Sequence, residues 1–255
     1  MNQYLPSASL KTQAKGQLLG KYPPLIGALI LMQLCTAPIS LSISFLIGTD
    51  SVIGMIIYSI ANFLFQLFVG FFTAGEAYLY LKTACGQTPA VPDLFHCFHG
   101  DTSKVVYLQA VMAGISVLCS LPTMITKFFL MKSLNLSDLE SLSEGTLPFN
   151  ATLFLVYVIV AILGVAISIF INLMLSQAFY LMLDFPEYPA SQLLKMSIRL
   201  MRGNKGRLFY IQLSFVPLLL LSLLSCGIAL LWIHPYMQAT YANFYLDLIK
   251  KKNRQ

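Results

Sequence analysis

The sequence predicts an all-α integral membrane protein with six transmembrane helices, built as three repeats of an interfacial amphipathic helix followed by a proline-kinked hairpin. Three observations predict this class. The 255 residues are 57% hydrophobic and only 10% charged, whereas a soluble domain carries about 25% charged residues. Long tracts contain no charge, and the segments before these tracts resemble one another. This composition excludes a disordered chain and a solvated two-domain globule.

Candidate spans are the stretches without Asp, Glu, Lys or Arg, because a bilayer core of ~30 Å needs ~20 apolar residues of helix. Such stretches occur at residues 22–49, 51–75, 105–126, 145–183 and 208–246. The first three each fit one helix, whereas the last two are long enough for two helices each.

Basic residues decide how many helices the long tracts contain, because Lys and Arg near span ends are retained in the cytoplasm. Splitting 145–183 would place the basic residues of 195–207 outside, so we interpret this tract as one long helix. Splitting 208–246 at Ser225-Cys226-Gly227 returns the basic tail, 250–255, to the cytoplasm. The prediction is therefore six spans.

This topology places both termini and nearly all the positive charge on the cytoplasmic side. Only Lys127 and Lys132, among the 16 basic residues, fall elsewhere. The net charge of +6 then comes from these cytoplasmic basic residues. Anionic lipid headgroups are the expected partner of this charge, and no nucleic-acid partner is predicted. Five spans, with 236–249 lying on the external surface, is the alternative.

The three repeats are visible in the segments that enter the odd-numbered spans. Residues 98–109 and 201–212 align without a gap, which pairs Gly100 with Gly203, and the N-terminal segment with Gly20 is a weaker third copy. We predict a single membrane domain, 1–255, with the basic cytoplasmic tail 250–255 at its end. The repeats within it cover residues 9–82, 91–184 and 188–249.

Each of these glycines follows a short amphipathic stretch, at residues 9–19, 93–99 or 190–202. The pattern is typical of a helix in the headgroup plane that ends at a glycine C-cap, and a solvent-exposed linker helix is the alternative. In the third stretch one face is apolar, with Leu193, Leu194, Ile198 and Met201. The candidates for binding lipid headgroups are Lys195, Arg199, Arg202, Lys205 and Arg207.

The hairpins share two further features. The first helix of each carries a proline, predicted to bend it, at Pro38, Pro122 and Pro217. The second carries an acid or amide followed by alanine near its cytoplasmic end, at Glu76, Gln177 and Gln238.

Polar residues inside the predicted spans form one stripe on each even-numbered helix. Such residues normally face a bundle interior or water. The candidate cavity residues are Asn62, Gln66, Glu76, Asn172, Gln177, His234, Gln238 and Tyr241. Two interpretations stay open: hydrogen bonds around a dry axis, or a wet cavity open to the cytoplasm with Glu76 as its only carboxylate. Glu76 also lies close enough to Lys82 to reach the interface, and His234 near Trp232 also fits an interface anchor.

Catalytic motifs are absent, since the sequence has no GxSxG, HExxH or Walker-type glycine loop. We predict no enzymatic activity and no cofactor or metal. The nearest local cluster of acids and imidazoles is Asp93, His96, His99 and Asp101. It could hold a metal or a phosphate headgroup, but the copy at 193–207 replaces all four residues.

The C-terminal region resembles an uncharacterised family of bacterial multi-pass membrane proteins, known only as a domain of unknown function. The resemblance is carried by Ser197–Phe209, Leu213–Phe215, Gly227–Trp232, Pro235-Tyr236 and Ala239–Tyr245, and by Leu10–Lys15, Leu19–Tyr22 and Asp93–Phe95. Residues 101–176 depart more, with Leu121-Pro-Thr where the family often has Pro-Gly-Ile. The resemblance implies an α-helical fold in the bacterial plasma membrane, and it implies no substrate.

Three functional hypotheses follow. The first is a non-enzymatic protein that contacts the bilayer and its anionic headgroups, as a lipid-interacting scaffold or as a subunit beside another membrane protein. The alternative is a small transporter or channel-like permease with a polar cavity between spans 2, 4 and 6. A membrane-embedded lipid-modifying enzyme is the second alternative.

Overall fold

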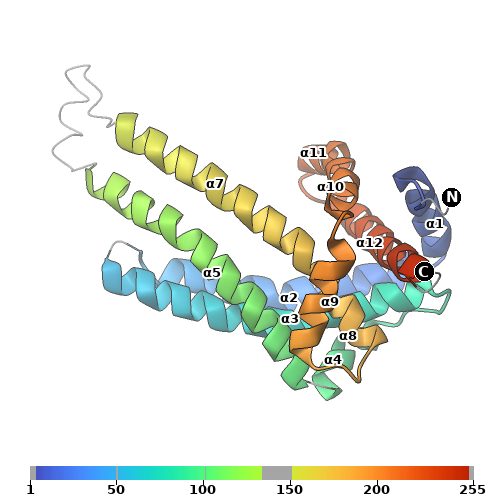
Figure 1. Cartoon of the computed structure of the whole chain (residues 1–255). Coiled ribbons are helices and arrows are strands. Elements are labelled where there is room, and N and C mark those ends of the chain that lie inside the picture. The colour runs from blue at the N-terminus through green and yellow to red at the C-terminus, as the bar shows by residue number, and fades with distance from the viewer. Residues whose placement is uncertain (1–3, 50, 101, 134–150, 253–255) are drawn as a thin grey trace. The chain divides into compact units, whose positions relative to one another are not determined.

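The computed structural model describes residues 4–49, 51–100, 102–133 and 151–252, and every regular element in these ranges is helical (Figure 1). This confirms the predicted all-α class. The elements are α1 (Ser7–Leu18), α2 (Tyr22–Leu46), α3 (Val52–Ala84), the 3-10 helix η1 (Val91–Phe95), α4 (His96–His99), α5 (Thr102–Ser133), α7 (Ala151–Leu175), α8 (Ala178–Asp184), α9 (Ala190–Met201), α10 (Lys205–Leu213), α11 (Val216–Leu224) and α12 (Leu230–Lys252).

The described residues form two compact units, where the sequence predicted one membrane domain. Unit 1 takes its residues from Met1–Pro38, Leu67–Gln109 and Leu173–Gln255, and unit 2 from Ile39–Gln66 and Ala110–Asn172. The unit boundaries fall inside α2, α3, α5 and α7, so each of these helices contributes to both units.

Five stretches of the described chain are long and apolar enough to cross a membrane. They are Tyr22–Leu46, Val52–Ala84, Thr102–Lys132, Thr152–Asp184 and Lys205–Leu224. These stretches support a multi-pass membrane protein, but they do not confirm six spans. The predicted sixth span corresponds to α12, which is not among them because polar and charged residues such as Asn243 and Asp247 interrupt its second half.

The second half of α12 lies beside α1 (Figure 1). Gln17 and Asn243 exchange side-chain hydrogen bonds, with Nε2 of Gln17 3.2 Å from Oδ1 of Asn243 and Nδ2 of Asn243 2.6 Å from Oε1 of Gln17. Gln17 also donates to the carbonyl of Ala84, at the end of α3. The C-terminal half of α12 is therefore packed against α1 within unit 1, and this contact by itself does not decide between five and six spans.

The tract predicted as one long helix at 145–183 gives one candidate span, Thr152–Asp184, with a short interruption inside it. Residues 145–150 lie outside the described part of the chain, and the remainder breaks at Ser176-Gln177, where α7 ends and α8 begins. The break leaves Gln177 with φ −94° and ψ −2°. This segment contains no glycine or proline, so tertiary packing rather than local sequence sets the break.

Prolines act differently in the three predicted hairpins. Pro38 lies inside α2 and Pro122 inside α5, as expected. Pro217 instead lies in the first turn of α11, after a break at Ser214-Phe215. Because proline has no N–H, it cannot bond the carbonyl four residues earlier, and a first helical turn accommodates it best.

Lys11 on α1 occupies this second break. Its Nζ donates to the carbonyl of Ser214 at 3.3 Å and lies 4.1 Å from the ring centroid of Phe215. Burial and the neighbouring charge of Lys15 lower the pKa of Lys11. A charged donor from α1 thus satisfies one of the carbonyls freed where α10 ends.

Glycine turns end two of the three amphipathic stretches, as predicted. Gly20 has φ +76° and Gly203 has φ +85°. In each case the preceding residue is extended, and the N–H of Lys21 or Asn204 donates to the carbonyl of the last helical residue, at 2.9 and 3.0 Å. Both are type II turns, which favour glycine at the third position. Gly100 is the C-cap of α4, as predicted, but its φ is −98° and not positive.

The helix α9 buries its apolar face in protein and not in lipid. Leu193 and Met201 are fully covered and Leu194 nearly so, whereas Ile198 is 38% exposed. Ser197 takes the predicted place of Ile198 on the buried face, and its Oγ donates to the carbonyl of Met174 at 2.8 Å. The apolar residues of this face, except Ile198, are therefore covered by protein, and the position of α9 in the headgroup plane stays a prediction.

Candidate functional site

A cavity of about 120 Å³, lined by both polar and apolar side chains, lies within unit 1. It is bounded by α3, the break between α7 and α8, α8 itself, α10 and α12. Its lining residues are Thr73, Glu76, Ala77, Ser176, Gln177, Phe179, Tyr180, Leu208, Gln212, Gln238 and Tyr241. Most of the polar groups on this lining carry oxygen atoms.

The single lining carboxylate belongs to Glu76, roughly 12 Å from the end of α3 at 1.5 Å per residue. Its side chain is 13% exposed. Nε2 of Gln238 donates to Oε2 of Glu76 at 3.4 Å, and Nδ1 of His234 lies 3.5 Å from Oε1 without forming a hydrogen bond. The carboxylate is thus held loosely by two side chains of α12.

Close packing fixes the turn of α3 that carries Glu76. A Cβ atom on Gly75 would lie 1.8 Å from the carbonyl oxygen of Leu94, so η1 lies directly against this turn. About two turns further on, Lys82 donates to Oδ2 of Asp93 at 2.8 Å, and the same oxygen accepts the N–H of Ala90. These contacts anchor the end of α3 to η1.

Gln177 lies at the helix break and is 1% exposed. Its Nε2 donates to Oγ of Ser176 at 2.8 Å. Its Oε1 is buried and has no hydrogen-bond partner among the described residues. Because buried polar atoms are nearly always paired, this oxygen marks a position where a donor or a cation is expected.

Five of the eight predicted cavity residues meet in unit 1. Glu76, Gln177, Gln238 and Tyr241 line the cavity, and His234 contacts Glu76. Glu76, Gln177 and Gln238 are the three positions that the repeat alignment paired, since each is an acid or amide followed by alanine.

The other three predicted residues lie in unit 2 and do not line this cavity. Asn62 accepts a 3.5 Å hydrogen bond from Gln66. Asn172 is exposed and bonds to the carbonyl and hydroxyl of Ser168. Each polar stripe runs along several turns, and only its end near the cavity contributes to the lining.

Sequence reasoning missed Tyr180 and Gln212. Tyr180 lies on α8, which was read as a continuation of a straight apolar helix. Gln212 lies on an odd-numbered span, whereas the predicted polar stripes lie on the even-numbered spans. The alignment of Gln212 with Gln109 was the signal that could have found it.

The predicted headgroup residues separate into two groups. Lys195, Arg199 and Arg202 are exposed on or beside α9. Arg207 instead bonds Asp247 at 2.5 Å and the carbonyl of Leu5 at 2.6 Å. Lys205 is half-buried. Arg207 is therefore engaged within the protein, while the α9 cations face outward.

The histidine segment makes contacts within the protein, although His96 and His99 are both exposed. Asp93 is held by Lys82, and the ring of His96 stacks on Tyr78 with centroids 4.0 Å apart. Asp101 lies outside the described residues. Within the described ranges, no group of three or more His, Cys, Asp or Glu side chains could hold a metal ion.

Comparison with known proteins gives one match. The family described as "Protein of unknown function (DUF975)" matches residues 1–252. No curated protein and no solved structure matches the chain.

Proposed function

Because the chain belongs to the DUF975 family of proteins of unknown function, we propose its role from the site alone: a small, non-enzymatic permease of the bacterial plasma membrane that binds a monovalent cation in the Glu76 cavity. The observation that carries the proposal is the convergence of Glu76, Gln177 and Gln238 on one cavity. The buried, unpartnered Oε1 of Gln177 adds an acceptor beside the carboxylate.

The chemistry of the lining favours a small hard cation. Carboxylate, amide and hydroxyl oxygens are the ligands that such ions prefer. Glu76 is the only charged lining residue, so one positive charge balances the site. A volume of about 120 Å³ holds a few water molecules at ~30 Å³ each, which suits an ion with part of its hydration shell and is too small for most organic solutes.

The helix break at Ser176-Gln177 supports transport over purely structural hydrogen bonding. Interrupted helices in membrane proteins are tolerated where they line a cavity, and they commonly mark ion sites in transporters. Interhelical hydrogen bonding around a dry axis would pair Oε1 of Gln177 and would leave no cavity beside it.

The test compares thermal stability of the purified protein in NaCl, KCl and NH4Cl with choline chloride at equal ionic strength. A cation at 100 times its Kd stabilises the folded state by ~2.7 kcal/mol, which corresponds to a rise in Tm of several degrees for a chain of this size. We expect one small cation to give this rise, and Glu76→Gln to abolish it.

Glu187→Gln is the matched control, since Glu187 is exposed in the connection before α9, and it should keep the full cation effect. Equal responses of both variants would remove Glu76 from the site. Flux of the stabilising cation into liposomes tests transport separately, and binding without flux would reduce the proposal to a cation-binding membrane protein.

A second candidate function is lipid contact, favoured by the exposure of Lys195, Arg199 and Arg202 on one helix. Each basic residue near an anionic surface contributes about 1 kcal/mol. Replacing all three by Gln should lower the anionic-lipid content of particles extracted with a styrene–maleic acid polymer. Replacing Arg207, which is engaged with Asp247, would not be a clean control, so the comparison is Lys250→Gln. An unchanged lipid content in the triple variant would contradict this function.

A further inference from the structure

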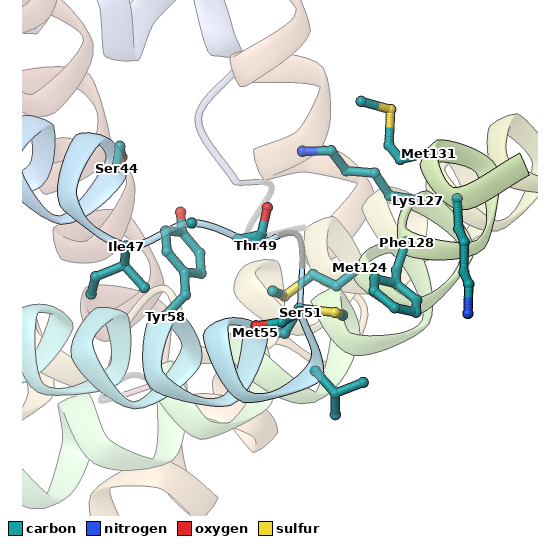
Figure 2. A pocket seen from close by; sticks show the side chains of 13 residues that line it. Ser44, Ile47, Thr49, Ser51, Met55, Tyr58, Met124, Lys127, Phe128 and Met131 are labelled. Carbon is teal, nitrogen blue, oxygen red and sulfur yellow. The ribbon is translucent and has the colours of Figure 1, made fainter. Parts of the chain in front are cut away.

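A second cavity lies in unit 2 and shares no lining residue with the Glu76 cavity. It has a volume of about 1,090 Å³ and lies between the α2–α3 connection and the last turns of α5 (Figure 2). The candidate spans Tyr22–Leu46, Val52–Ala84 and Thr102–Lys132 each have one end within a few residues of it. The cavity is therefore at a membrane boundary, where lipid headgroups lie.

The lining is positively charged. Lys127 and Lys132 from α5 both contribute to it and are exposed. The described lining contains no Asp or Glu, and neither lysine forms an ion pair with a described residue. Hydroxyl groups of Thr49 and Ser51 add hydrogen-bond donors from the opposite wall, whereas the Ser44 hydroxyl donates to the carbonyl of Ser40.

The rest of the wall is apolar and adaptable. Met55 on α3 faces Met124 and Phe128 on α5 (Figure 2). Methionine is flexible and polarizable, so it packs against ligands of irregular shape. A cationic end joined to an adaptable apolar wall fits an amphiphile with an anionic head.

The same two lysines are the exceptions to the predicted topology. Every other basic residue lies on the predicted cytoplasmic side, where positive charge is normally retained. Cytoplasmic retention does not account for Lys127 and Lys132, which lie at the opposite end of the spans. Their positive charges therefore need a different partner. Negative charge in a lipid headgroup provides one.

We propose that this cavity binds an anionic phospholipid, with its phosphate paired to Lys127 and Lys132 and an acyl chain against Met55, Met124 and Phe128. The cavity's volume of about 1,090 Å³ is slightly above the range, about 300–1,000 Å³, of pockets that hold small organic ligands. The proposal is independent of the cation site, because no residue is shared.

The test uses tryptophan quenching by brominated lipid, since Trp232 is the only tryptophan. A Phe128→Trp, Trp232→Phe variant is placed in phosphatidylcholine nanodiscs that contain a small fraction of brominated phosphatidylglycerol or brominated phosphatidylcholine. We expect brominated phosphatidylglycerol to reach half-quenching at a mole fraction about thirtyfold lower than brominated phosphatidylcholine, because each of two basic residues near the headgroup contributes about 1 kcal/mol.

Adding Lys127→Gln and Lys132→Gln should abolish this preference. These changes also remove positive charge from the predicted external side, so they favour the same topology. Wild-type protein is the matched control for bulk lipid, because Trp232 is half exposed and lies outside the cavity. Lys250→Gln, at an exposed position near the end of α12, should leave the preference unchanged.

Equal quenching by the two phospholipids, or a preference that survives the lysine substitutions, would overturn the proposal. Stronger quenching by brominated oleate than by brominated phosphatidylglycerol would replace the phospholipid with a free fatty acid and also overturn it. If the tryptophan variant does not fold, native mass spectrometry of wild-type protein replaces quenching, and one retained phosphatidylglycerol that is lost in the double lysine variant is the expected result.

Discussion

Cys226 adopts a backbone conformation that favours glycine. It has φ +50° in the turn after α11, where its N–H donates to the carbonyl of Leu223 and the N–H of Gly227 donates to that of Ser222, at 3.1 and 2.8 Å. A residue other than glycine, asparagine or aspartate is strained there by about 1 kcal/mol or more. This paired hydrogen bonding is the Schellman arrangement.

Replacing Cys226 by glycine should therefore stabilise the protein by about 0.5–1 kcal/mol, measured as a rise in Tm in detergent. Cys85→Gly is the matched control, because Cys85 is also exposed and also precedes a glycine of positive φ, Gly86, but is not itself in that conformation. The control should be neutral or destabilising. A lower Tm for Cys226→Gly than for Cys85→Gly would show that the side chain of Cys226 matters more than its backbone.

At the scale of single residues, the sequence predicts those site residues that are marked by their position around a helix axis. Glu76 and Gln238 were found because each lies on the polar face of a helix, and Gln177 because its Gln-Ala pair recurs. Asn62 satisfied the same angular criterion, yet it lies in unit 2. Helical periodicity gives the direction of a side chain but not its depth along the helix, and depth decides which polar residues share a cavity.

Arg207 joins three elements at the scale of helices. It lies on α10, pairs with Asp247 on α12 and bonds the carbonyl of Leu5 before α1. Its guanidinium also lies 4.6 Å from the ring centroid of Tyr4 and 5.0 Å from that of Phe244. The two side chains of the ion pair are 19% and 12% exposed, so water screens this pair only in part.

Arg207→Gln should destabilise the protein by roughly 2 kcal/mol, because it leaves a largely buried carboxylate without its partner. Arg199→Gln is the control, since Arg199 is exposed on α9 and exposed pairs contribute well under ~1 kcal/mol. Limited proteolysis near the N-terminus measures whether α1 is released. Similar stability of both variants would indicate that Arg207 contacts lipid headgroups, as the sequence alone suggested.

Breaks within helices were the least predictable feature of the elements. Pro217 carried a signal for the break at Ser214-Phe215, since proline favours a first helical turn. The break at Ser176-Gln177 carried none, because its flanks are uniformly apolar and contain no glycine or proline. Its cause is packing between residues distant in sequence, including Ser197, whose hydroxyl bonds the carbonyl of Met174.

For the whole molecule, composition determines the class of protein but not the number of crossings. The helices α2, α3, α5 and α7 each contain a long apolar stretch, so charge-free length was enough to find them. The helix α12 is ambiguous because its first half is apolar while its second half is packed in protein through Asn243 and Tyr245. Hydropathy is the same whether a residue is buried in lipid or in protein. It therefore cannot distinguish a membrane span from a helix that is buried against α1.

The contact between α12 and α1 is consistent with two topologies that differ in the path of α11. In one, α11 and α12 both cross the membrane, and in the other they form a hairpin that enters and leaves on one side. Cys226, exposed in the turn between them, distinguishes these cases. If both helices cross, a membrane-impermeant maleimide should label a variant retaining only Cys226 in intact cells, and a variant retaining only Cys85 should be labelled only after permeabilisation.

A variant retaining only Cys97 provides the matched control. Cys97 is 5% exposed, and burial raises the pKa of its thiol to about 11. Little of it is thiolate at neutral pH, and thiolate is the reactive form, so it should resist the reagent on both sides. Labelling of Cys226 only after permeabilisation, in parallel with Cys85, would establish the one-sided hairpin. The exposed leucines of α11, such as Leu223 and Leu224, would then enter the bilayer without crossing it, and the six-span prediction would be wrong.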